Sequence, residues 1–174
     1  MRVFGFFVIL ITIFGFTTSY KSEYLVIDSK KISVESSTSV GDFTCNYNFD
    51  SKDTLFLNRK VGYFYKVPVK EFGCGNFLLN RDFRKTLKEK EFPNVSVNLF
   101  DVKKEGKDFS YSLDLNLAGK QKTYKNLILK KENKTLNGSI SVKFSDFDLV
   151  APKKLGGAIK VKEDIKLSFV LNTR

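Results

Sequence analysis

Few side chains in this sequence are suited to acid–base or metal chemistry. The chain has 174 residues and no histidine, so it lacks the side chain that most often serves as a general base near neutral pH and as a zinc ligand. No spacing in the sequence brings two carboxylates to one site, as a glycosidase would require. We therefore predict no catalytic residue and no metal site, and we interpret the protein as a non-enzyme. The carboxylates considered lie near expected strand or helix ends, where capping roles are common: Asp28, Asp82, Asp146, Asp148 and Asp164.

Two cysteines, Cys45 and Cys74, are the other reactive side chains. They are 29 positions apart and lack the Cys-x-x-Cys spacing of a redox pair. In an oxidising compartment such a pair forms a disulfide by default, and closing this loop stabilises a fold by roughly 3–4 kcal/mol in the chain-entropy model. A structural disulfide is favoured, with two reduced buried thiols as the alternative.

The N-terminus has the order of a secretory signal peptide. Met1-Arg2 precedes an apolar run over 3–16, and the small polar residues Thr17-Thr18-Ser19 follow it. The alternative is a retained membrane anchor, but the run is shorter than the roughly 20 residues that span a bilayer. We predict a signal peptide over 1–19 and one exported domain over 20–174.

The dominant period of the remaining sequence is two. Strict alternation of apolar and polar residues indicates strands with one buried and one solvated face, typical of antiparallel sheets. Short strands separated by short turns favour a barrel or a sandwich. The sequence therefore predicts an all-β fold, an antiparallel barrel or sandwich. The alternating segments are 43–49, 61–69, 95–99, 109–117, 140–144 and 165–171.

One segment, near residues 79–90, departs from this period. Its apolar residues Phe83 and Leu87 are four apart, Asn80 or Asp82 is available to cap its start, and Pro93 follows its end. The spacing predicts one short amphipathic helix with a narrow apolar stripe against the sheet.

The order of these parts resembles the YceI-like family. The resemblance rests on segments 24–28 and 72–76, on Asn80-Arg81-Asp82-Phe83 with Leu87, on Phe92-Pro93, and on Gly156-Gly157 before 165–171. It covers nearly all of residues 24–172. It implies an exported bacterial protein, periplasmic or extracellular. Its fold would be an all-β, antiparallel lipocalin-like β-barrel of about eight strands with one short α-helix, which holds a polyisoprenoid chain.

The chain also departs from the family pattern. The family often opens with a Trp and an Asp followed by a His-Ser pair, whereas Tyr24, Asp28 and Ser29-Lys30-Lys31 stand here. Long-chain lipid binding is therefore implied as a class, without the identity of the lipid. Cys45 and Cys74 resemble a cysteine-containing branch of the family, which implies a disulfide across the barrel.

Inward-facing aromatic and aliphatic residues are the candidate lipid-binding residues. A barrel of about eight strands is wide enough either to be filled by its own side chains or to hold one small ligand. The resemblance favours an open lumen, and a filled core is the alternative. The predicted lumen residues are Phe43, Tyr47, Phe49, Tyr63, Tyr65, Phe109, Tyr111, Leu113, Phe144 and Phe169.

The net charge of +11 indicates a basic outer face. Export argues against nucleic acid as a partner, and weak contact with an anionic membrane surface would suit a lipid carrier. The expected function is sequestration or transport of a long-chain isoprenoid such as a polyprenyl or quinone tail, with no cofactor other than this lipid. The alternative is a secreted structural or interaction barrel with a filled core that contacts anionic polymers or membranes.

Overall fold

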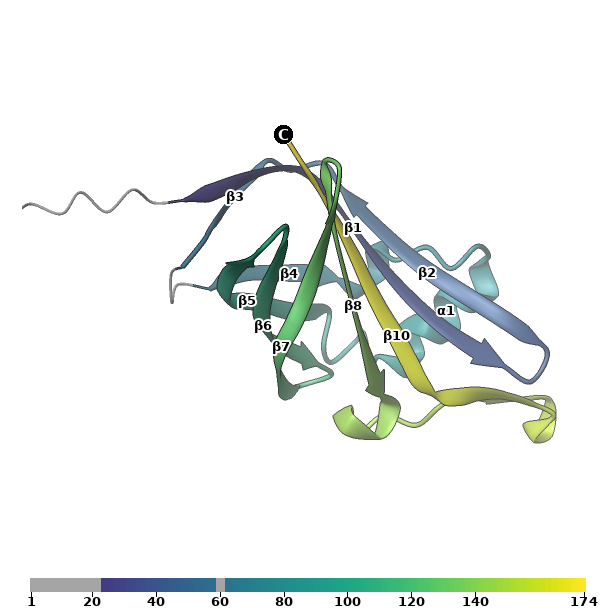
Figure 1. The fold of residues 1–174 in the computed structure, drawn as a ribbon. Helices are drawn as coiled ribbons and strands as arrows, with labels where there is room; N and C mark the ends of the chain where they lie inside the picture. Colours follow the sequence, from purple (N-terminus) through teal and green to yellow (C-terminus); the bar gives the residue numbers. More distant parts are fainter. Residues whose placement is uncertain (1–22, 59–61) are drawn as a thin grey trace, which may run out of the picture.

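The computed structural model describes residues 23–58 and 62–174. The predicted signal peptide over 1–19 lies outside these described residues. The described chain forms one strongly curled antiparallel sheet with a helix beside its open side (Figure 1).

The sheet confirms the predicted all-β, lipocalin-like fold with one helix. Its strand order is β2-β1-β10-β8-β7-β6-β5-β4, and the short strands β3 and β9 pair with β1 and β10. Helix α1 spans Phe77–Thr86, and single 3-10 turns occupy Val69–Glu71 (η1), Phe144–Phe147 (η2) and Leu155–Gly157 (η3). The strands are β1 Tyr24–Thr38, β2 Gly41–Phe49, β3 Asp53–Phe56, β4 Tyr63–Pro68, β5 Asn94–Glu105, β6 Asp108–Leu117, β7 Lys120–Glu132, β8 Thr135–Lys143, β9 Lys153–Lys154 and β10 Ile159–Thr173.

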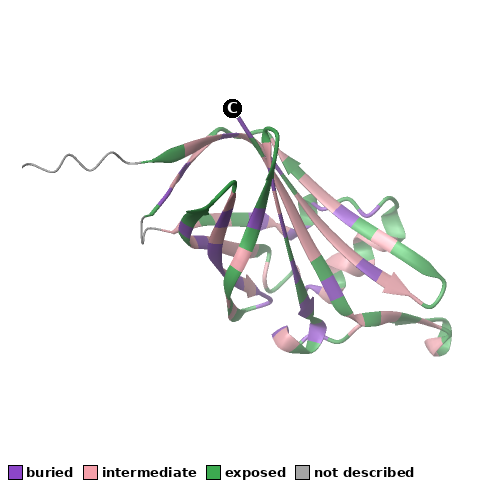
Figure 2. Cartoon of the chain, in the orientation of Figure 1, coloured by how far each residue is buried: buried purple, intermediate pink, exposed green. Residues whose placement is uncertain are grey.

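Alternating side chains give the sheet a buried inner face and a solvated outer face. On β6, Leu113, Leu115 and Leu117 are buried, whereas Asp114 and Asn116 between them are partly exposed. The same alternation appears as bands of colour along the strands (Figure 2). The hairpin from β6 to β7 turns at Ala118-Gly119, where both residues have positive φ (50° and 80°), as a two-residue hairpin turn with the twist of its strands requires.

Strand β1 and strand β7 were not predicted from the sequence, and bulges explain why. The pairing of β1 with β10 shifts between Ile27 and Ser29, so the phase of its inward residues changes there. On β7 the register shifts between Tyr124 and Leu127, next to Asn126, whose φ is 56°. A shift of one residue moves the apolar set to the other face, so neither strand shows a single period.

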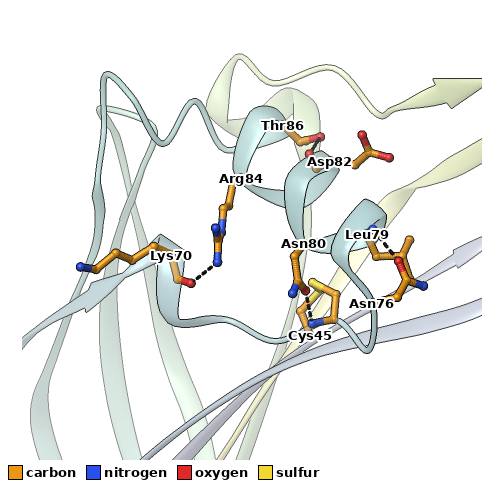
Figure 3. Close-up of a disulfide and its surroundings, with 9 residues drawn as sticks. Cys45, Lys70, Asn76, Leu79, Asn80, Asp82, Arg84 and Thr86 are labelled. Carbon is orange, nitrogen blue, oxygen red and sulfur yellow. Dashed lines mark hydrogen bonds between the residues drawn. A yellow bond between two sulfur atoms is a disulfide. The ribbon is translucent and has the colours of Figure 1, made fainter.

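The two end strands of the sheet, β2 and β4, do not pair with each other in a ladder. Residues 69–76, which follow β4 in the chain, join them instead. Asn46 of β2 forms an isolated bridge with Gly73, through N–H···O bonds of 2.9 Å in both directions. The adjacent residues Cys45 and Cys74 form a disulfide beneath α1 (Figure 3). We call this junction between β2 and residues 69–76 the seam.

Helix α1 lies over the seam and begins earlier than predicted. Asn76 is its N-cap and accepts a hydrogen bond from the Leu79 N–H at 2.9 Å, so the predicted caps Asn80 and Asp82 are wrong. The side chain of Asn80 instead accepts a bond from the Cys74 N–H at 2.7 Å, which fixes the helix to the disulfide (Figure 3). The helix ends at Thr86 because Lys88 has a left-handed φ of 53°. In the described part of the chain no helix is long and apolar enough to cross a bilayer.

Candidate ligand-binding cavity

An apolar cavity of about 220 Å³ runs along the inner face of β1. Every second residue of the strand contributes to its wall, in the order Lys30, Ile32, Val34, Ser36 and Thr38. Eight residue steps of a strand cover about 26 Å, so the cavity is long and narrow.

The remaining walls come from the rest of the curled sheet and from one face of α1. Leu79 and Phe83 of α1 and its C-cap Leu87, each one turn apart, close the side of the cavity over the seam. The volume exceeds by far the roughly 10–15 Å³ that one water needs, but the walls offer few hydrogen-bond partners. Such a space favours a hydrocarbon over water. The aliphatic wall residues of β5, β6, β8 and β10 are Val95, Val97, Leu99, Leu113, Leu115, Leu117, Ile140, Val142, Ile159, Val161, Ile165, Leu167 and Leu171.

A glycine makes room for one aromatic wall residue. Gly138 on β8 pairs directly with Phe169 on β10, and a Cβ atom added at Gly138 would lie 2.4 Å from the Phe169 ring. The ring therefore lies flat over the glycine, and its edge contacts Tyr111 with ring centroids 5.8 Å apart. The missing side chain at 138 keeps Phe169 against the wall.

Lys30 places a buried charge at one point of the cavity. Its Nζ donates to the Ser51 carbonyl oxygen at 2.8 Å and to Ser51 Oγ at 3.0 Å, and lies 3.6 Å from Asp53 Oδ2. The rings of Phe49 and Tyr65 lie 5.3 and 5.1 Å from Nζ, a cation–π arrangement. The ammonium is thus fully partnered, as a buried charge requires.

Tyr65 extends this polar cluster to β4. Its hydroxyl donates a hydrogen bond to Asp53, so the side chains of β1, β3 and β4 meet at Asp53. Burial, together with this bond and the charge of Asp53, holds the pKa of Tyr65 well above its ordinary value. The hydroxyl therefore stays protonated and acts as a donor.

The cavity is closed at one end and open at the other. At the closed end Ile27, Leu55 and Leu99 are buried. At the other end Asp82 and Lys154 form an ion pair of 2.7 Å, and Lys154 is exposed. We call this second end, formed by α1, the β1–β2 hairpin and residues 144–161, the rim.

Most of the predicted lumen residues lie where the alternation placed them. Phe43, Phe49, Tyr63, Tyr65, Leu113, Phe144 and Phe169 line the cavity. Tyr47, Phe109 and Tyr111 do not line it. Tyr47 packs on Phe72 near the seam, and Phe109 and Tyr111 are buried in the hydrophobic core. Sequence reasoning missed Lys30, although its place two residues before Ile32 and four before Val34 could have indicated an inward position.

Four of the five carboxylates considered for chemistry, Asp28, Asp82, Asp146 and Asp148, are engaged in ion pairs, and Asp164 is exposed. Arg174 Nε lies 3.1 Å from Asp28, and Lys120 Nζ lies 2.6 Å from Asp148. Asp146 accepts hydrogen bonds from Lys122 and from the Lys143 N–H, which hold the pKa of Asp146 below its ordinary value. The hydrogen bond from Lys120 likewise lowers the pKa of Asp148. Among the described residues, no group of three His, Cys, Asp or Glu side chains could hold a metal ion.

Two solved structures resemble this architecture. In sequence comparison no protein-family profile and no curated protein matches the chain. A polyisoprenoid binding domain from Saccharophagus degradans, implicated in plant cell wall breakdown, aligns with a TM-score of 0.59 at 15% identity, over 88% of this chain and 99% of that one. BcnA of Burkholderia cenocepacia aligns with a TM-score of 0.53 at 13% identity, over 82% of this chain and 94% of that one. The chain shares the fold of these two proteins.

Proposed function

We propose that the protein is an exported, YceI-like lipid carrier that holds a long-chain isoprenoid, or a similar amphiphile, inside the curled sheet. The observation that carries this proposal is the apolar cavity along β1. The shared fold with a polyisoprenoid binding domain supports it. The engagement of four of the five candidate carboxylates in ion pairs favours binding over catalysis.

The shape of the cavity suits a slender chain. The stretch of β1 that lines the cavity, Lys30 to Thr38, spans about 26 Å, which approaches the roughly 30 Å thickness of a bilayer's hydrocarbon core. Burying one isoprene unit removes on the order of 100 Å² from water, which contributes roughly 2–3 kcal/mol before entropic costs. Several units therefore reach the about 8 kcal/mol of micromolar binding without a hydrogen bond.

The polar groups of the cavity orient the amphiphile. Ser51 and Asp53 already partner the Lys30 ammonium, so a head group at the closed end would have to displace them. Asp82, Thr86 and Lys154 at the rim are partly or fully exposed and can meet a head group together with water. We infer that the apolar tail enters first and that the head group stays at the rim.

The disulfide fits the export part of the proposal. Bonds such as Cys45–Cys74 persist in oxidising compartments and are rare in the cytosol of ordinary cells. A periplasmic or extracellular carrier is the form of the proposal that agrees with this chemistry.

The test is lipid extraction followed by mass spectrometry on protein purified after expression of the full chain. We expect a stoichiometric long-chain lipid in the wild type. Val34 lines the cavity in the middle of β1, so Val34→Phe fills the space and should reduce the bound lipid at least tenfold without loss of folding. Val170 on β10 does not line the cavity, so Val170→Phe is the matched control and should keep the lipid.

The outcomes separate a cavity from a packed core. Protein without extractable lipid that also takes up none from a polyprenyl or quinone solution would refute the proposal. So would a folded Val34→Phe protein with unchanged lipid content, because the ligand would then lie elsewhere. A cooperative thermal transition establishes folding for each variant.

A further inference from the structure

The loops at the rim carry exposed aliphatic side chains at their tips. Val40 at the β1–β2 turn is 73% exposed, Val150 after η2 is 81% exposed, and Leu155 in η3 is 79% exposed. Turns normally carry polar residues, and exposed apolar residues that gather on one surface mark an interaction site.

Two of these tips, Val40 and Leu155, belong to one surface. Ser39, the neighbour of Val40, donates its N–H to the Lys160 carbonyl oxygen at 3.1 Å and its Oγ to the Ala158 carbonyl oxygen at 3.1 Å. Ala158 in turn donates its N–H to the Leu155 carbonyl oxygen at 3.2 Å. The hairpin and the β9–β10 loop thus lie side by side at the lower right of the molecule, where exposed residues predominate (Figures 1 and 2).

Leu155 is unfavourable in its position for two independent reasons. Its φ of 49° lies in the left-handed region, which glycine and asparagine adopt at lower cost than a branched apolar residue. Its side chain also lies almost wholly in solvent. Neither folding nor solubility favours leucine here, which points to a contact made outside the chain.

The opposite end of the sheet differs. Its described turns, residues 50–52, 106–107 and 133–134, consist of Asp, Ser, Lys, Gly and Asn, and all are exposed. Apolar tips are therefore a property of the rim and not of the loops in general.

The charge of the rim indicates the partner. Lys153 and Lys160 face each other across the β9–β10 pair, and both are exposed next to the apolar tips. Lys154 is paired with Asp82, and Asp42 of β2 lies in the hairpin. The acidic residues of the η2 segment, Asp146 and Asp148, are paired with Lys122 and Lys120. Aliphatic tips among lysines match the interface of an anionic bilayer, with acyl chains below negatively charged head groups.

We propose that the rim docks on the surface of an anionic lipid bilayer through Val40 and Leu155, with Lys153 and Lys160 contacting lipid phosphates. Docking in this orientation turns the open end of the cavity toward the membrane. An apolar chain then passes between bilayer and cavity without exposure to water. The docking surface does not depend on a ligand in the cavity. Only the transfer of an apolar chain between bilayer and cavity rests on the proposed function.

The test measures flotation of the purified protein with two kinds of vesicle, phosphatidylcholine with 30% phosphatidylglycerol and phosphatidylcholine alone. We expect binding to the anionic vesicles, at least tenfold weaker binding to the neutral ones, and loss of binding at high salt for the electrostatic part. The double variant Val40→Ser/Leu155→Asn keeps the net charge, and asparagine tolerates the left-handed backbone. It should bind anionic vesicles at least tenfold more weakly. Phe64→Ser/Ile128→Ser, which removes two exposed apolar side chains from other strands, is the matched control and should bind as the wild type does.

Each result decides the proposal. Equal vesicle binding by the wild type and the rim variant overturns it, as does absence of binding to anionic vesicles. Binding to heparin together with failure to bind vesicles assigns the surface to an anionic polymer and also overturns it. Lipid content by mass spectrometry separates the two proposals: a rim variant that keeps its lipid but loses vesicle binding supports both, whereas lipid-free wild type that still docks refutes only the carrier.

Discussion

The side chain of Tyr111 is buried, but its hydroxyl takes no part in a hydrogen bond among the described residues. The side chain is 1% exposed and packs against Phe169. Burial raises the pKa of Tyr111, so the group stays a neutral, unpaired donor. An unpaired polar group inside a core costs free energy that a phenylalanine would not.

We expect Tyr111→Phe to keep the free energy of unfolding or to raise it by up to about 1 kcal/mol. Tyr65→Phe is the contrasting variant, because it removes the donor to Asp53 and should lower the free energy of unfolding by about 1–2 kcal/mol. Urea unfolding measures both. A Tyr111→Phe protein that is clearly less stable than the wild type would show that the hydroxyl is partnered after all.

The inward residues could be predicted one by one wherever the alternation was clean, and not elsewhere. Leu113 and Phe169 were placed correctly because their strands keep one phase over the predicted segment. Lys30 was missed because a charged side chain is expected on the outer face. Its partners Ser51 and Asp53 lie more than 20 positions away in the sequence and reach it only when β3 pairs with β1. Tyr111 was assigned to the right face, but the sequence does not distinguish a cavity wall from the packed core beside it.

At the scale of elements, the seam holds together two strands that do not pair. The isolated bridge between Asn46 and Gly73, the disulfide, and α1 above them take the place of a ladder between β2 and β4. Ring contacts add to the junction: Tyr47 and Phe72 lie 5.9 Å apart, and Phe49 and Tyr65 lie 6.3 Å apart. The sequence predicted a helix but not its cap, because Asn80 and Asp82 are as suitable for capping as Asn76, which accepts the Leu79 N–H.

Removing the disulfide should weaken the seam before the rest of the sheet. We expect Cys45→Ala/Cys74→Ala to lower the free energy of unfolding by roughly 2–4 kcal/mol, since the bridge closes a 29-residue separation. Hydrogen exchange should accelerate at residues 45–47 and 72–80 while β6 keeps its protection. Uniform acceleration over all strands would contradict a local role for the bridge.

The rim turn η2 should be sensitive to acid. Hydrogen bonds from Lys122 and from Ser145 lower the pKa of Asp146 and of Glu163 respectively, so these groups bind fewer protons in the folded than in the unfolded state. Their contribution is present above the unfolded pKa of about 4 and is lost as the pH falls through the folded value. We expect the free energy of unfolding to decrease from pH 5 to pH 3, with a shallower slope for Asp146→Asn. Asp50→Asn at the opposite end removes the same charge, and an equal effect there would contradict a specific role for η2.

At the scale of the molecule, an unfilled cavity makes stability depend on its occupant. A ligand that binds only the folded state adds RT ln(1 + [L]/Kd), about 2.7 kcal/mol at a hundredfold excess over Kd. We expect delipidation in detergent to lower the melting temperature and added polyprenyl alcohol to restore it. Val34→Phe should show neither effect, because its side chain occupies the same space. A delipidated wild type that melts at the original temperature would argue for a core that is complete without ligand.

The whole fold was easier to predict than its interior. Period-two segments and one helical stretch were enough to indicate a curled antiparallel sheet with a helix. The open lumen depends on small differences in side-chain volume, such as Gly138 beneath Phe169, which no periodicity contains.

The seam also bears on ligand selectivity. In a fully closed barrel, strand number and shear fix the diameter, so a thicker ligand would require broken ladder bonds. In the described sheet no ladder joins β2 to β4. The disulfide and the Asn46–Gly73 bridge fix their separation at the seam, and on either side of it only side-chain contacts would have to change for a thicker ligand. Such a cavity can widen at little cost in free energy. Its depth is fixed, because the buried residues Ile27 and Leu55 close its end. We therefore expect the cavity to select ligands by their length and to tolerate variation in their thickness.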